Sequence, residues 1–190
     1  MTGPANGAGV FDAARECFED TLGWLESNDA AVLTHAELED ELDSRGRELL
    51  RRMVQDHFSL RAASERRLDS VCDADTVAHG AVEAGHRRPL ATIFGQVDVE
   101  RLAYRHRGHP NLYPADAVLN LPTELHSHGL RRLAALEASR GSFDEARAAV
   151  ERATGQHVAK RQVEALAARA GADVAEFLSL IHISEPTRPY

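Results

Sequence analysis

The sequence predicts a mainly α-helical chain with a small β-hairpin subdomain, an α+β fold that carries a helix-turn-helix near its C-terminal end. Three observations lead to this prediction. Apolar residues recur at helical spacing between His35 and Ala63, whereas side chains alternate with the period of a strand from Val97 to Tyr104. From Ser127 onward, three helix signals follow one another at short intervals.

Composition and charge limit the classes of protein to consider. The 190 residues are 43% hydrophobic, enough for the core of one ordinary domain or two small ones. No apolar run approaches the ~20 residues that span a bilayer, and the first residues lack a signal-peptide pattern. We therefore expect no membrane partner and a cytoplasmic location.

The charge of the chain is unevenly distributed. Residues 1–60 hold 13 acidic against 5 basic residues, which accounts for the net charge of −8 and leaves residues 61–190 neutral. The negative net charge of the whole chain therefore does not exclude nucleic-acid binding by residues 61–190.

The N-terminal region, residues 10–68, is predicted to be helical after a disordered terminus at residues 1–9. A first helix is expected from Val10 to Ser27. Thr34 and Glu37 then form the S/T-x-x-E pattern of a capping box, and leucines follow at helical spacing. These signals predict a long amphipathic helix from about His35 to Ala63.

Residues 69–109 are predicted to form the hairpin region. Gly95 and Gln96 stand between two β-favouring runs and are expected to form the turn. The segment 70–80 is expected to add another short strand. Residues 110–126 follow as an extended connector, because their prolines interrupt any continuous helix or central strand.

Residues 127–177 are predicted to form three helices. The first runs from about Ser127 to Arg140, with Gly141 expected as its left-handed C-terminal cap. Ser142 and Glu145 make a second capping box, and the helix that they start is expected to end at Gly155. A third helix is expected to begin near Ala159 and to bury an apolar stripe that contains Val163, Leu166, Ala167 and Ala170.

Two helices joined by a short turn that contains glycine match the layout of a DNA-binding helix-turn-helix. At 100° per residue, Arg161, Ala165 and Ala168 lie opposite the buried stripe of the third helix. Alanines allow close approach, while long polar side chains reach phosphates and base edges. The predicted DNA-binding residues are Lys160, Arg161, Gln162 and Arg169, with Arg131 and Arg132 of the first helix as phosphate contacts.

Other interpretations of these residues remain open. Any three-helix unit has a solvated face with some basic residues, and Glu151 and Glu164 argue against DNA contact. Five arginines give the hairpin region a local positive charge and a possible second nucleic-acid surface, although an exposed charged face that discourages edge pairing is the favoured explanation. They are Arg87, Arg88, Arg101, Arg105 and Arg107.

The sequence indicates neither a metal site nor an active site. His106, His109, His126 and His128 lack a cysteine or carboxylate partner at a fixed spacing. Asp73 and Asp75 could hold a cation, but turn formation is the favoured interpretation. No hydrolase, phosphate-loop or Cys/His catalytic motif occurs. Cys17 and Cys72 lie in no ligand spacing and are predicted to be buried, reduced thiols.

Four runs occur in a characteristic order: "ELEDELDSRGRELLRRMVQDHFSLRAA", "LATIFGQVDVERLAYR", "NLYPADAVLNLP" and "HSHGLRRLAALEASRGSFDEARAAVERATGQHVAKRQVEAL". In this order they resemble the N-terminal part of bacterial insertion-sequence transposases of the ISKra family, from about Thr34 to Phe177. The resemblance implies a region that recognises the double-stranded DNA of element ends for DNA transposition. It also implies a following ribonuclease-H-like domain, whose Asp/Asp/Glu triad uses Mg²⁺ for phosphoryl transfer. No residue of this sequence is assigned to such a triad. The chain is therefore expected to have no cofactor and no catalytic activity of its own.

The last residues differ in composition from the rest. Lys160 is the only lysine and Ile93 the only isoleucine before Leu178, whereas Ile181 and Ile183 follow closely. The run "LSLIHISEPTR" resembles the translated adapter of transposon-based sequencing libraries. Residues 178–190 are therefore expected to be adapter-derived, and the chain is expected to be a truncated gene product.

The rival interpretation of the whole chain is a non-enzymatic helical interaction or transcription-regulator module, in which the long helix pairs with another chain or forms a homo-oligomer.

Overall fold

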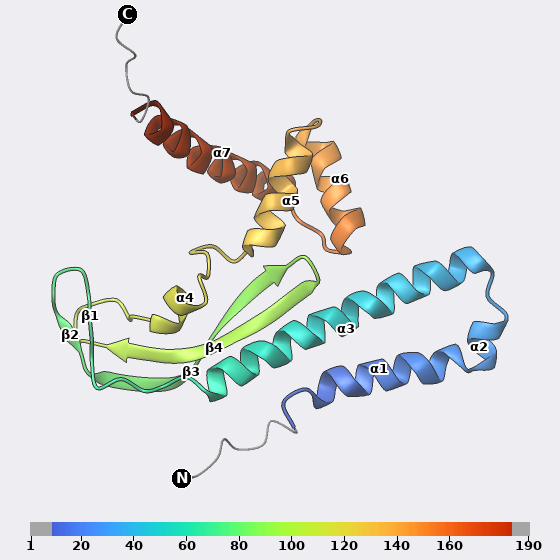
Figure 1. The fold of residues 1–190 in the computed structure, drawn as a ribbon, viewed down its shortest axis with the longest axis horizontal. Coiled ribbons are helices and arrows are strands. Elements are labelled where there is room, and N and C mark those ends of the chain that lie inside the picture. The colour runs from blue at the N-terminus through green and yellow to red at the C-terminus, as the bar shows by residue number, and fades with distance from the viewer. Residues whose placement is uncertain (1–8, 184–190) are drawn as a thin grey trace, which may run out of the picture. The chain divides into compact units, whose positions relative to one another are not determined.

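A computed structural model describes the backbone of residues 9–183 and the side chains of residues 9–171. This part of the chain forms two compact units, which divide between residues 125 and 126 (Figure 1). Unit 1 contains α1 (Asp12–Leu25), α2 (Asn28–Ala31), α3 (His35–Ala63), β1 (Val71–Cys72), β2 (Ala78–His79), β3 (Ala81–Thr92), β4 (Gly95–Arg105) and α4 (Pro114–Val118). Unit 2 contains α5 (His128–Ala138), α6 (Phe143–Thr154) and α7 (Lys160–Ile183). The predicted α+β class is confirmed. The expected disordered terminus at residues 1–9 lies, except for Gly9, outside the described residues.

The long helix α3 has the predicted bounds, and its start is confirmed in atomic detail. Thr34 Oγ1 accepts a hydrogen bond from Glu37 N, and Glu37 Oε2 accepts one from Thr34 N at 2.8 Å. This capping box satisfies backbone donors that the first turn leaves without partners. The preceding helix ends earlier than expected, because the Ser27 side chain accepts from Ala30 N and starts α2 instead.

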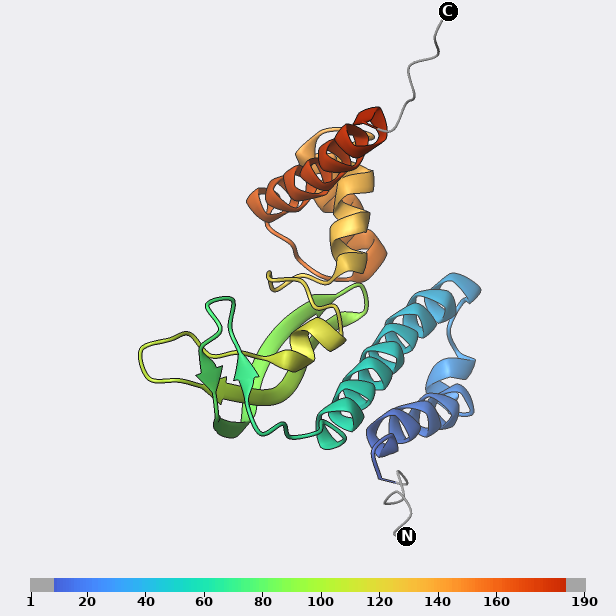
Figure 2. The same cartoon turned by 60° about the vertical axis from the view of Figure 1, so that its left-hand side comes forward.

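Helix α1 lies alongside α3 in both views (Figures 1 and 2). Its N-cap residue, Phe11, offers no side-chain hydrogen bond. Asp56 of α3 supplies it instead, since its buried Oδ2 accepts from Ala14 N in the first turn of α1 at 3.1 Å. A carboxylate near a helix N-terminus also interacts favourably with the helix dipole. Asp56 thereby connects the two helices.

Strands β3 and β4 form the predicted antiparallel hairpin, but the turn lies at Ile93 and Phe94 rather than at Gly95 and Gln96. Thr92 pairs with Gly95, and its side chain donates to Gly95 O and accepts from Phe94 N, which closes the turn two residues earlier. Gly95 is required for another reason. A Cβ there would lie 2.6 Å from the Arg51 side chain of α3.

The short strand expected within residues 70–80 is confirmed as a two-stranded ribbon, in which Val71 pairs with His79 and Cys72 with Ala78. Cys17 is buried as predicted, whereas Cys72 is exposed. That second prediction was wrong because adjacent residues of a strand point to opposite sides, and it is Val71 that faces inward.

The connector packs on the hairpin but is not wholly extended, since α4 interrupts it. Pro114 stands in the first turn of α4, where its missing N–H costs no helical hydrogen bond. Leu119 and Leu121 pack against the core residues Leu90, Val97 and Val99, as do Val54 and Phe58 of α3. The core of unit 1 therefore lies between α3, the hairpin and the connector.

The edge of β4 that does not pair with β3 is covered by other segments. The Gln55 carboxamide bonds both backbone groups of Asp98, with distances of 3.0 Å to Asp98 O and 2.8 Å from Asp98 N. Further along, Leu102 N donates to Glu65 Oε2, and Tyr104 exchanges two backbone hydrogen bonds with Leu112. An open strand edge invites pairing with another chain, and these partners occupy it.

Unit 2 follows the predicted order of helices. Ser127 caps α5, the capping box of Ser142 and Glu145 starts α6, and Gly155 ends α6 in the left-handed conformation at φ 68°. Gly141 does not act as a left-handed cap, because α5 ends at Ser139 in a right-handed conformation.

Helix α7 continues without a break past Leu178, and the rest of the expected adapter-derived tail, residues 184–190, lies outside the described residues. Within the described part of the chain, no helix is long and apolar enough to cross a membrane.

Replacing Gln55 by alanine tests the covering of the β4 edge. We expect the free energy of unfolding of unit 1 to fall by about 1 kcal/mol, because two hydrogen bonds to Asp98 are lost at a site that water can reach. Urea denaturation followed by circular dichroism measures the change. Gln96→Ala, at an exposed position of the same hairpin, is the matched control and should change stability little. Equal losses in the two variants would show that Gln55 does not stabilise the edge.

Candidate nucleic-acid interface

Helix α7 is oriented in unit 2 by the residues that it buries. Val163 is fully buried and Leu166 is 3% exposed, and they pack in a core with Leu130 of α5 and Val150 of α6. Val158, in the segment between α6 and α7, is buried as well. Ala167 and Ala170, also predicted on this stripe, are half-buried. The inward face of α7 is therefore the predicted one.

The opposite face of α7 is open to solvent. All four polar residues predicted there are exposed, and so are the two alanines between them. They are Lys160, Arg161, Gln162, Ala165, Ala168 and Arg169. The small alanines leave room for a bulky partner to approach the helix, and the long side chains surround that space.

Lys160 and Gln162 of this face make hydrogen bonds within unit 2. Lys160 Nζ lies 2.6 Å from Asp144 Oδ2 of α6, and this carboxylate raises the pKa of Lys160 above its usual value. Gln162 Oε1 accepts from Ala159 N at 3.1 Å and so closes the first turn of α7. That bond uses the carbonyl oxygen of Gln162 and leaves its amide NH₂ as a donor. Asp144 is a competitor for any anion that Lys160 would bind.

The two arginines of α5 differ in position. Arg132 is exposed and lines a shallow apolar hollow with Glu164 and Ala168 of α7, so the structure brings it to the predicted face. Arg131 is half-buried. The half-buried Glu164 places a negative charge at this face, whereas Glu151 forms an ion pair with Arg147 at 2.9 Å.

The arginines of the hairpin serve the fold of unit 1. Arg87 pairs with Glu100, Arg105 with Glu83, and Arg88 donates to the carbonyl oxygens of Pro122 and Glu124. With Arg101, which pairs with Asp116, four of the five predicted arginines have partners within unit 1, and this speaks against a second nucleic-acid surface there.

Arg101 corrects the expectation of an exposed charged face. Its side chain is 8% exposed, bonds both carboxylate oxygens of Asp116 at 2.8 and 3.0 Å, and stacks on Tyr113 with its guanidinium carbon 4.0 Å from the ring centroid. A planar guanidinium suits both contacts. Arg101 therefore fastens α4 to β4.

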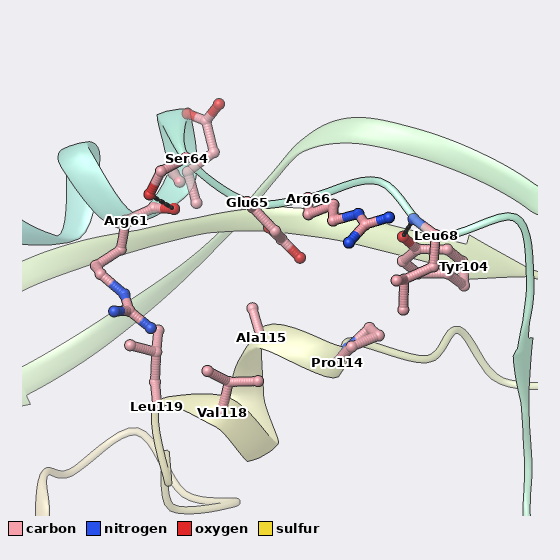
Figure 3. A pocket seen from close by; sticks show the side chains of 12 residues that line it. Arg61, Ser64, Glu65, Arg66, Leu68, Tyr104, Pro114, Ala115, Val118 and Leu119 are labelled. Carbon is pink, nitrogen blue, oxygen red and sulfur yellow. Dashed lines mark hydrogen bonds between the residues drawn. The ribbon is translucent and has the colours of Figure 1, made fainter. Parts of the chain in front are cut away.

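A pocket of about 360 Å³ opens beside the β4 edge in unit 1 (Figure 3). Arg61, Glu65, Tyr104, Val118 and Leu119 are among its lining residues. Two of its polar side chains bond the backbone, since Glu65 accepts from Leu102 N and the Tyr104 hydroxyl accepts from Leu68 N at 2.8 Å. No cysteine or histidine is among the described residues that line it.

Sequence reasoning missed one cluster of chemically active side chains. Asp73, His79 and His109 each offer one ligand atom, and these atoms all lie within 4.8 Å of one another. The sequence pattern favours a turn at Asp73, gives His79 no ligand spacing, and places no carboxylate at a fixed spacing from His109. The only available signal was the His-x-x-His spacing of His106 and His109.

The exposed basic face of α7 and the internal pairing of the hairpin arginines place the candidate nucleic-acid interface on unit 2. Its core members are Arg161, Gln162 and Arg169, with Lys160 held by Asp144 and Arg132 beside them. Comparisons of the chain with models of known protein families, with curated proteins and with solved structures find no match.

Proposed function

We propose that this chain is an N-terminal, DNA-binding part of an insertion-sequence transposase, which recognises the double-stranded ends of its element in the bacterial cytoplasm. The observation that carries the proposal is the exposed face of α7. There Arg161 lies opposite the fully buried Val163, with the exposed Gln162 and Arg169 beside it, on the second of two helices joined by a turn that begins at Gly155. The resemblance of residues 34–177 to transposases of the ISKra family supports the same function.

In this proposal α7 acts as the recognition helix of a helix-turn-helix. Ala165 and Ala168 let the helix approach the floor of the major groove, while the arginines bond phosphates or guanine edges. The amide NH₂ of Gln162 is a donor for a base acceptor. The proposal assigns DNA binding to this chain and no step of phosphoryl transfer.

A second candidate function, a protein-interaction module, rests on a different observation. Leu136 and Phe143 are 46% and 39% exposed and line the apolar hollow beside α7. Exposed apolar surface of this kind is a feature of protein interfaces. Light scattering coupled to size-exclusion chromatography separates the two functions, because dimerisation without DNA binding would favour the module.

The salt dependence of DNA binding tests the main proposal. With three or four phosphate contacts, log affinity for a fluorescein-labelled duplex should fall against log salt with a slope of roughly −3. The double variant Lys160→Ala with Arg161→Ala should make this slope shallower by roughly 2, because two phosphate contacts are lost. Fluorescence anisotropy at several salt concentrations gives both slopes.

The charge-matched control is Arg66→Ala with Arg67→Ala, two exposed arginines of unit 1. This variant should bind the duplex as the unmodified chain does. An affinity that salt does not change, or equal slopes in the two double variants, would contradict the assignment of DNA binding to α7.

Asp144→Asn tests the competition for Lys160. We expect DNA affinity to rise roughly threefold, as for the loss of one exposed ion pair, because Lys160 is released and a negative charge is removed. Asp29→Asn, which removes one charge from unit 1, should leave the affinity unchanged. The same anisotropy assay measures both variants, and a weaker binding of Asp144→Asn would show that this ion pair orients α7 instead.

A further inference from the structure

Three residues from separate segments of unit 1 surround one point in space. Asp73 follows β1, His79 lies on β2, and His109 lies in the loop after β4. Asp73 Oδ2 is 3.3 Å from His79 Nε2 and 3.2 Å from His109 Nδ1. The side chain of His79 is fully buried, and that of Asp73 is 15% exposed. The cluster is thus largely shielded from water but reachable from the side of His109, whose side chain is 35% exposed.

The two carboxylate oxygens of Asp73 have different roles. Oδ1 accepts hydrogen bonds from Asp75 N at 3.0 Å and Val77 N at 2.9 Å, which forms the turn between β1 and β2. This confirms the turn that the sequence predicted. Oδ2 takes no part in the turn and faces the two imidazole rings. The turn therefore holds Asp73 in one orientation, with one oxygen available as a ligand.

The hydrogen bond of His79 defines which of its nitrogens is available. Its Nδ1 lies 3.3 Å from the carbonyl oxygen of Tyr104, which can only accept, so Nδ1 carries the proton. Its other nitrogen, Nε2, is directed at Asp73 Oδ2, 3.3 Å away. A cation bound here would take Nε2 and Oδ2 as ligands. A ring nitrogen held by a backbone carbonyl is also the usual support of a metal-binding histidine.

The spacing of the ligand atoms suits a small divalent ion. Bonds of 2.0–2.1 Å in tetrahedral geometry place neighbouring ligand atoms about 3.3 Å apart. Asp73 Oδ2 lies at nearly this distance from both histidines, 3.2 Å from His109 Nδ1 and 3.3 Å from His79 Nε2. His106 completes the surroundings, with its ring centroid 5.1 Å from that of His109 and its Nδ1 held by Ala78 O at 3.0 Å. Two imidazoles and one carboxylate form a donor set typical of Zn²⁺.

We propose that Asp73, His79 and His109 bind one divalent transition-metal ion, Zn²⁺ above all, with water at the fourth position. The ion fastens the β1–β2 ribbon to the loop after β4. A ribbon with two-residue strands has little stability of its own, so a link of this kind stabilises it. The site is independent of the DNA-binding face on unit 2.

Metal titration of the whole chain tests the proposal. The untagged 190-residue protein is treated with chelator, dialysed, and titrated with Zn²⁺ in a calorimeter and with Co²⁺ in a spectrophotometer. We expect one equivalent of Zn²⁺ to bind and to raise the melting temperature. Bound Co²⁺ should show the visible absorption bands of a low-coordinate site with nitrogen and oxygen ligands.

Two variants remove ligands with little risk to the fold. His109→Ala changes a partly exposed loop residue, and Asp73→Asn keeps an oxygen that accepts the two turn bonds. Each should weaken Zn²⁺ binding by at least about a hundredfold and abolish the Co²⁺ bands, while circular dichroism stays unchanged. The control His35→Ala breaks an exposed His–Glu pair of α3 and should bind Zn²⁺ normally.

Some results would overturn the proposal. One is that the unmodified chain gives no one-to-one Zn²⁺ binding isotherm. The other is that His109→Ala and Asp73→Asn bind Zn²⁺ with the same affinity as His35→Ala. Either would mean that Asp73 and His79 form a hydrogen-bonded pair that needs no metal.

Discussion

The backbone of β4 requires hydrogen-bond partners on its outer edge, and the arrangement of unit 1 depends on how they are supplied. A two-stranded sheet leaves every second N–H and C=O of each strand without a strand partner. Here Gln55 from α3, Glu65 from the segment after α3, and Leu112 from the connector bond this edge in turn. Each bond brings a different part of the chain against the hairpin. The apolar contacts of Val54 and Phe58 with the core then follow, because they lie on the same side of α3 as Gln55.

The hydrogen bonds of the β4 edge also position the proposed metal site, because Tyr104 takes part in both. Its backbone pairs with Leu112, its hydroxyl accepts from Leu68 N, and its carbonyl oxygen receives His79 Nδ1. A single buried residue of β4 therefore positions the connector, the segment that leads to β1, and the ring that faces Asp73. Loss of the β4 edge contacts would displace the histidine cluster as well as the core.

Unit 2 is organised by local interactions to a greater degree. Serine caps start α5 and α6, and Gly155 ends α6. These bonds join residues a few positions apart, so the lengths and order of α5 and α6 do not depend on distant parts of the chain. What the packing adds is the direction of α7, since burial of Val163 and Leu166 turns Arg161 and Arg169 outward. The proposed DNA-binding function uses this outward face. Asp144 reduces the positive charge of the face at the start of α7, where it pairs with Lys160.

The sequence by itself determined the helices with capping boxes, the existence of the hairpin, the buried stripe of α7 and the exposure of its basic face. These features follow from hydrogen bonds and periodicities within a few residues, which a sequence displays directly. Only the tertiary structure decided the turn at Ile93 and Phe94, the burial of Arg101 against Asp116, and the meeting of Asp73, His79 and His109. The turn is closed by the Thr92 side chain, which bonds Gly95 O and Phe94 N, whereas the sequence pattern favours the Gly95–Gln96 pair. The other two depend on side chains far apart in the chain, and a local pattern does not show which distant partner will satisfy a buried charge or ring nitrogen.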